Sequence, residues 1–118
     1  MTDAHTALSV RIRRLLNQRD PKDPCITYQA LATALGLAPP GTIRRVAAAL
    51  EQTMHEDLAT GHPMIAALVV SRASKLPQRG FFDLAVALGR FPADPGRHRA
   101  AWQAECTAIL QQQTDISP

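Results

Sequence analysis

The chain has 118 residues, of which 46% are apolar and 19% are charged, and this length fits one compact domain. Its 11 arginines and 2 lysines outnumber the 10 acidic residues and give a net charge of +3. No apolar run is long enough to span a membrane, and the N-terminus lacks the pattern of a secretory signal. Cys25 and Cys106 show no CxxC spacing. We therefore expect a small cytoplasmic domain with two free thiols.

The first 61 residues predict three helices. Apolar residues recur at helical spacing in each one, and prolines or a glycine follow each one. Thr27 and Thr42 are suitable N-caps for the second and third helices, and Gly36 is a suitable stop for the second. Two helices joined by a short turn with glycine are the outline of a helix-turn-helix. The expected ranges are Thr6–Gln18, Tyr28–Leu35 and Thr42–Gly61.

The second half of the chain predicts a small β-hairpin and two more helices. Met64–Val70 is an unbroken apolar run, which favours a buried strand. After a polar loop at Ser71–Gln78, we expect Arg79–Phe81 to start a returning strand. A hairpin after a helix-turn-helix is a wing, so the predicted fold class is mainly α with a small β-hairpin, a winged helix-turn-helix. The remaining helices are expected at Phe82–Leu88 and from Asp94 to about Gln113.

We expect one domain over residues 1–118, with loose ends at 1–5 and 112–118. Its charge is uneven, because residues 1–45 hold seven Lys or Arg, whereas residues 46–70 hold three acidic residues and no Lys or Arg. In a winged helix, the start of the recognition helix and the wing face DNA together. The alternative is a set of ordinary solvated arginines. The basic residues expected on a DNA-binding face are Arg11, Arg14, Arg44, Arg45, Arg72, Lys75 and Arg79.

The segments Ile26–Ala32 and Arg44–Leu50, with Gly36 between them, carry a recognisable pattern. They resemble the DNA-binding domain of alkylguanine-DNA alkyltransferases and of their catalytically inactive alkyltransferase-like relatives. That family has a Tyr-x-x-Leu-Ala helix, a glycine turn and then Arg-Ala-Val-Gly at the start of the recognition helix. The resemblance covers roughly residues 6–110 and is distinctive only in the first half. It implies that Arg44 enters the base stack in place of a flipped base and that Tyr28 lies near the phosphate of that nucleotide.

The chemistry of that family is not expected here. Its nucleophile is the cysteine of a Pro-Cys-His-Arg motif just before a Val-Val pair, whereas this chain has Ile65–Leu68, with two alanines, before Val69-Val70. His55 and His62 do not form the HExxH pattern of a zinc site. We therefore expect no enzyme activity, no cofactor and no metal. The leading hypothesis is non-enzymatic binding of double-stranded DNA, with Arg44 and Arg45 at a groove. Five phosphate contacts, from Arg11, Arg14, Arg72, Lys75 and Arg79, would give a log–log salt slope of about −4.

The second hypothesis is a protein-interaction module, an adaptor or inhibitor of a larger machine, on the same scaffold. A winged-helix fold does not by itself establish DNA binding, because one fold supports many functions. This hypothesis predicts weak DNA affinity and a partner surface around the three phenylalanines. If they were exposed they would mark a partner surface, but their simplest interpretation is core. These residues are Phe81, Phe82 and Phe91.

Overall fold

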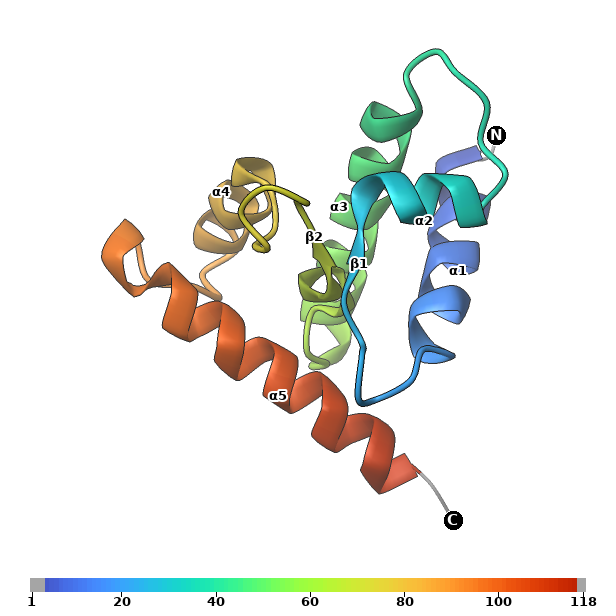
Figure 1. The fold of residues 1–118 in the computed structure, drawn as a ribbon. Helices are drawn as coiled ribbons and strands as arrows, with labels where there is room; N and C mark the ends of the chain where they lie inside the picture. The colour runs from blue at the N-terminus through green and yellow to red at the C-terminus, as the bar shows by residue number, and fades with distance from the viewer. Residues whose placement is uncertain (1–3, 117–118) are drawn as a thin grey trace.

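The computed structural model describes the backbone of residues 4–116 and the side chains of residues 7–113. This part of the chain forms five α-helices, two 3-10 turns and one pair of short strands around a common core (Figure 1). The prediction of a mainly helical chain with a small β element is confirmed. The elements are α1 (Ala4–Asn17), β1 (Ile26–Thr27), α2 (Tyr28–Ala34), α3 (Thr42–Thr60), η1 (Ile65–Leu68), β2 (Val69–Val70), α4 (Arg79–Ala87), η2 (Pro95–Arg97) and α5 (His98–Ile116).

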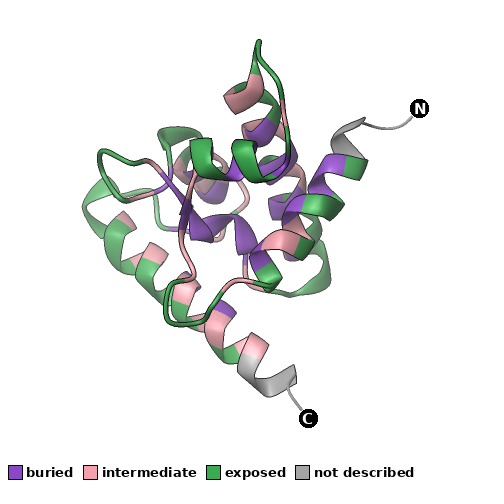
Figure 2. Ribbon diagram, turned by 45° about the vertical axis from the view of Figure 1, so that its right-hand side comes forward, coloured by how far each residue is buried: buried purple, intermediate pink, exposed green. Residues whose placement is uncertain are grey.

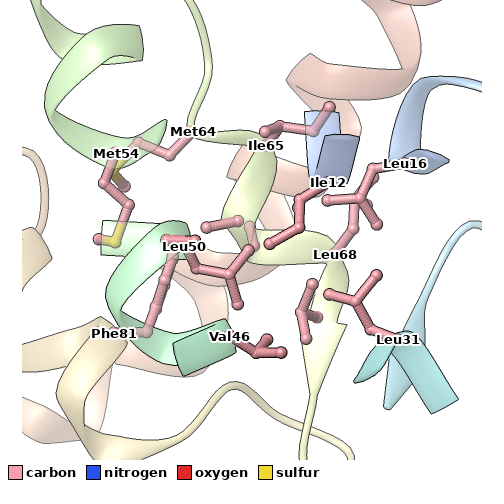
Figure 3. Close-up of a cluster of buried hydrophobic side chains, with 14 of the residues drawn as sticks. Ile12, Leu16, Leu31, Val46, Leu50, Met54, Met64, Ile65, Leu68 and Phe81 are labelled. Atoms are coloured by element: carbon pink, nitrogen blue, oxygen red, sulfur yellow. The ribbon is translucent and has the colours of Figure 1, made fainter. Parts of the chain in front are cut away.

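The core is built around η1, which α1, α3 and α5 all contact. Every residue of η1 is buried, and Figure 2 shows the buried residues gathered at the centre of the molecule. Ile12 and Leu16 of α1 and Leu50 of α3 point toward Leu68 of η1 (Figure 3). Leu31 of α2 closes this cluster from another side (Figure 3). Burial of these apolar side chains is the main term that holds the helices together.

The predicted strand at Met64–Val70 is mostly a 3-10 turn. Only Val69 and Val70 are extended, and they form β2. Helices surround the segment and bury it on all sides. Each of its side chains is therefore apolar, as it would be in either a strand or a helical turn. A short apolar run without periodicity does not distinguish a strand from a buried helical turn. The burial of the segment was therefore predictable, but its conformation was not.

The predicted hairpin is wrong for the described residues. β2 pairs with β1 in parallel, with Ile26 opposite Val69 and Thr27 opposite Val70. The expected returning strand is instead the first turn of α4. Phe81 and Ala85, four residues apart, are both buried, so this segment follows the period of a helix and not that of a strand. The expected wing is replaced by a loop over residues 71–78.

The two central helices begin differently. Thr27 is the N-cap of α2, as predicted, and its Oγ1 accepts a hydrogen bond from Ala30 N at 3.1 Å. Thr42, in contrast, is the first residue of α3, and Gly41 occupies the N-cap with a φ of +73°. Glycine tolerates this left-handed conformation at little cost, but it has no side chain to cap the helix. The first turn of α3 therefore keeps amide groups that no side-chain cap satisfies.

Helix α5 is tied to both ends of η1 by polar contacts. Trp102 Nε1 donates to the carbonyl oxygen of Ala67 at 2.8 Å. Glu105, which is only 9% exposed, accepts a hydrogen bond from Met64 N at 2.6 Å. Arg90 Nε lies 3.2 Å from the same carboxylate. These contacts place α5 across the molecule from α4 toward the end of α1 (Figure 1).

Helical backbone extends into both terminal segments for which loose structure was expected. α1 begins at Ala4, and α5 continues to Ile116. The rest of those segments, residues 1–3 and 117–118, lies outside the described residues. Within residues 4–116, none of the helices combines the length and the apolar character needed to cross a membrane.

Candidate functional site

A groove of about 290 Å³ opens between the first turns of α2 and α3 and the 71–78 loop. Ile43 of α3 lines one part of it, and Ser71, Arg72 and Ala73 of the loop line another. Thr27 and Gln29 belong to the start of α2. The groove therefore lies where the predicted recognition helix and the predicted wing were expected to meet. The complete lining is Thr27, Tyr28, Gln29, Ile43, Ser71, Arg72, Ala73 and Gln78.

Tyr28 connects the two sides of this groove. Its ring is buried, with 6% of the residue exposed, and its hydroxyl oxygen accepts a hydrogen bond from the backbone N–H of Gln78 at 2.9 Å. Burial raises the pKa of the tyrosine hydroxyl. The hydroxyl is therefore a structural group that holds the end of the 71–78 loop against α2.

The 71–78 loop is closed on itself by backbone hydrogen bonds. Ser71 N donates to Leu76 O at 2.7 Å, and Lys75 N donates to Ser71 O at 2.8 Å. Lys75 has a φ of +60°, a left-handed conformation that non-glycine residues adopt mainly in tight turns. Arg72 and Lys75 are exposed in this compact turn. The loop thus presents two cations beside the groove without any strand pairing of its own.

Three of the predicted basic residues are associated with the groove. Arg72 lines it, Lys75 lies in the same loop, and Arg44 follows Ile43 on the first turn of α3. All three side chains are exposed. The uncapped amide groups of the same turn of α3 add partial positive charge, which favours an anion at that end of the helix. The arrangement is suited chemically to contact phosphate groups.

The other four predicted residues are placed differently. The guanidinium of Arg11 donates to Leu35 O at 2.6 Å, at the end of α2, and that of Arg45 donates to Ala38 O at 2.6 Å. Arg14 is exposed on α1 and does not line the groove. Arg79 lies 3.7 Å from Asp83, and both side chains are largely exposed. Arg11 and Arg45 therefore stabilise the turn around residues 35–41, a role that the sequence did not indicate.

A second, smaller cavity shares Tyr28 and Gln78 with the groove. Its volume is about 30 Å³, which is room for about one water molecule. Tyr28 borders both spaces, and Ala66 of η1 forms part of the wall of the smaller one. Ala66 occupies the position at which the resemblance would place the nucleophilic cysteine, and its methyl group offers neither a nucleophile nor a hydrogen bond. The lining is Tyr28, Ala47, Leu50, Glu51, Met54, Ala66, Gln78, Gly80 and Phe81.

A buried ion pair was missed by the sequence analysis. Asp57 is 2% exposed. Its carboxylate accepts hydrogen bonds from Arg13 Nη1 at 2.6 Å and from Ile65 N at 2.9 Å. It borders a cavity of about 240 Å³ beside the end of α1. Its signal was its spacing, because residue 57 continues the buried stripe of Leu50 and Met54 along α3.

Comparisons of the chain with known protein families, with curated proteins and with solved structures gave no match. Among the described residues, no group of three or more His, Cys, Asp or Glu side chains is arranged to hold a metal ion. The candidate site is therefore defined by its own geometry, as a groove bordered by the start of α3 and by Arg72 of a compact loop that also carries Lys75.

Proposed function

We propose that this protein binds double-stranded DNA without catalysing a reaction, through the groove between α3 and the 71–78 loop. The proposal treats α2, its turn and α3 as a helix-turn-helix, and the compact loop as the functional counterpart of a wing. The observation that carries it is the pairing of the first turn of α3 with a loop cation across one groove. This is the pairing of elements by which winged helices contact DNA.

The proposed roles of the three cations differ with their positions. Arg72 and Lys75 contact phosphates on one side of a groove of the duplex, because both are exposed in a loop of fixed shape. Arg44 contacts base edges or the opposite phosphates from the first turn of α3, where arginine can donate two parallel hydrogen bonds. Phosphate contacts position the protein on the duplex, and base contacts add any sequence preference.

The protein-interaction alternative gains no support from the three phenylalanines around which it predicts a partner surface. Phe81 and Phe91 are each 6% exposed, and Phe82 is half-buried. The three rings pack on one another, with centroids 5.3 to 6.1 Å apart. The imidazole of His98 stacks on Phe82 at 5.1 Å. The cluster is therefore core that joins α4 to the start of α5, as the simpler interpretation of these residues predicted.

The direct test is fluorescence anisotropy with a short labelled duplex at low salt. The double variant Arg44→Ala/Arg72→Ala removes two cations at the groove. The matched control Arg97→Ala/Arg99→Ala removes two exposed cations at the start of α5. Both variants have the same net charge, so they separate local contact from general electrostatic attraction.

We expect the groove variant to bind about tenfold more weakly or worse, since each lost cation removes a phosphate or base contact. The control should retain affinity close to that of the wild type. Equal weakening of both variants would contradict a localised interface. Absence of binding by the wild-type protein at low salt would contradict DNA binding itself. Thermal melts of all three proteins show whether each variant is folded.

A further inference from the structure

The two cysteines, 81 positions apart in the sequence, meet at the end of η1. Cys25 directly precedes β1. Because Ile26 lies opposite Val69 in the parallel pair, Cys25 lies at about the same level as Leu68. Cys106 of α5 approaches the same place from another side, since its Sγ lies 3.8 Å from Ala67 O. Strand register and helix packing thus bring both residues to one point independently.

The two thiols also interact with each other. Each thiol acts on the pKa of the other, and both cysteines are free and only partly buried. Small molecules can therefore reach this pair from solvent. The surrounding backbone is held in place, because Trp102 Nε1 donates to the same Ala67 carbonyl that Cys106 contacts.

The environment makes the two sulfurs chemically unequal. The pKa of the Cys25 thiol is lowered to about 7, first because Cys106 donates a hydrogen bond to it and also because Arg19 lies nearby. Arg19 is fixed there, since its Nη2 donates to the carbonyl oxygen of Cys25 at 3.0 Å. The pKa of Cys106 is raised, because it is the donor in the pair and is partly buried. Cys25 therefore ionises more readily than Cys106.

We propose that Cys25 and Cys106 form a redox-modification site at which a peroxide converts the two thiols into a reversible intramolecular disulfide. In the first step, the Cys25 thiolate attacks a peroxide oxygen. The O–O bond breaks, the leaving hydroxide takes up a proton to become water, and Cys25 becomes a sulfenic acid. In the second step, Cys106 loses its proton and attacks that sulfur. The S–S bond forms, the S–O bond breaks, and a second water leaves.

The disulfide would fasten the segment before β1 to α5. β1 leads directly into Thr27 and Tyr28, so the cross-link would fix the strand that begins α2 against the helix that covers η1. It would also close most of the chain into one loop, and closing a long loop restricts the unfolded state strongly. Oxidation should therefore raise the melting temperature. This proposal does not depend on DNA binding.

The test is peroxide treatment of the full-length protein, followed by alkylation, tryptic digestion and mass spectrometry. The expected product is monomeric, lighter than the reduced protein by two hydrogen atoms and resistant to alkylation. Its digest should contain peptides 23–44 and 100–118 joined to each other. Dithiothreitol should restore both alkylation sites. The oxidised protein should melt about 10 °C or more above the reduced one.

The variants Cys25→Ser and Cys106→Ser provide the controls. Each should fail to form the linked peptide pair, and peroxide should not raise the melting temperature of either one. Three results would overturn the proposal. The first is oxygen addition at the cysteines without the linked peptides, and the second is covalent dimers as the main product. The third is that both thiols can still be alkylated completely after peroxide treatment. None of these readouts involves DNA, so this proposal and the proposed function can fail separately.

Discussion

At the scale of single residues, Asp57 is a buried charged group that joins three elements. Its carboxylate joins Arg13 of α1 to Ile65 N of η1 from within α3. Asp57→Ala should lower the free energy of unfolding by about 3 kcal/mol, because it leaves the buried amide of Ile65 without its acceptor and removes the buried carboxylate that pairs with Arg13. Chemical denaturation measures this change.

Glu56→Ala is the matched control for that prediction. Glu56 contacts the same guanidinium at 3.0 Å, but its side chain is 44% exposed. Its removal should cost less than about 0.5 kcal/mol, because exposed ion pairs contribute little. If the two variants lose similar stability, Asp57 does not have the role assigned to it.

The reactivity of Cys25 is a second prediction at this scale. Its alkylation rate should rise with pH around a midpoint near 7, because only the thiolate reacts. The groups that act on it are Cys106 from α5 and Arg19 and Asp23 from its own loop, and Glu105 acts on Cys106.

Cys106→Ala removes the hydrogen bond that lowers the pKa of Cys25. The midpoint should therefore move to higher pH, and alkylation at pH 7 should become slower. Peptide mapping of the alkylated site at several pH values measures both quantities. An unchanged midpoint in the variant would mean that Cys106 does not stabilise the Cys25 thiolate.

Residue identity predicted exposure better than it predicted contacts. Arg44, Arg72 and Lys75 are exposed, as expected of basic residues in turns and first helical turns. Arg11 and Arg45 instead donate to carbonyl oxygens around the turn between α2 and α3. Those partners lie 24 and 7 positions away in sequence, and which carbonyl faces a guanidinium depends on tertiary packing.

At the scale of elements, the bond between Tyr28 and Gln78 links α2 to the 71–78 loop. Tyr28→Phe keeps the buried ring and removes the acceptor of the Gln78 amide. We expect a loss of about 1 kcal/mol in stability and faster hydrogen exchange at the Gln78 amide. The Ala30 amide, which donates to Thr27, is the internal control. Equal acceleration at both amides would indicate general unfolding and not the release of the loop.

The sequence predicted the helices well, because their signals are local. Apolar spacing and caps such as Thr27 act within a few residues of the backbone they shape. It did not predict the parallel pairing of β1 with β2, which joins segments more than 40 residues apart. Val69 and Val70 need a partner strand, and the sequence alone does not identify the segment that supplies it. The sequence predicted that the start of α3 and the 71–78 loop would lie together. It did not predict the shape of the groove between them, because that shape depends on the pairing of β1 with β2.

At the scale of the whole molecule, the proposed function requires several cations to gather at one groove. The five phosphate contacts expected from the sequence are Arg11, Arg14, Arg72, Lys75 and Arg79. In the structure, however, Arg11 donates to a backbone carbonyl, Arg79 lies beside an acidic residue, and Arg14 does not line the groove. The proposed phosphate contacts are therefore Arg72, Lys75 of the same loop and Arg44 of the first turn of α3. The expected log–log slope of affinity against salt is therefore about −3 rather than about −4.

The salt dependence of affinity reports the number of phosphate contacts made at the groove. Fluorescence anisotropy of a short duplex across a salt series should give a slope of about −3 for the wild-type protein. Arg44→Ala/Arg72→Ala should reduce its magnitude by about 2, because two released counterions are lost, and Arg97→Ala/Arg99→Ala should leave it unchanged. A flat salt response, or an equal slope in the wild type and the groove variant, would contradict DNA binding at this groove.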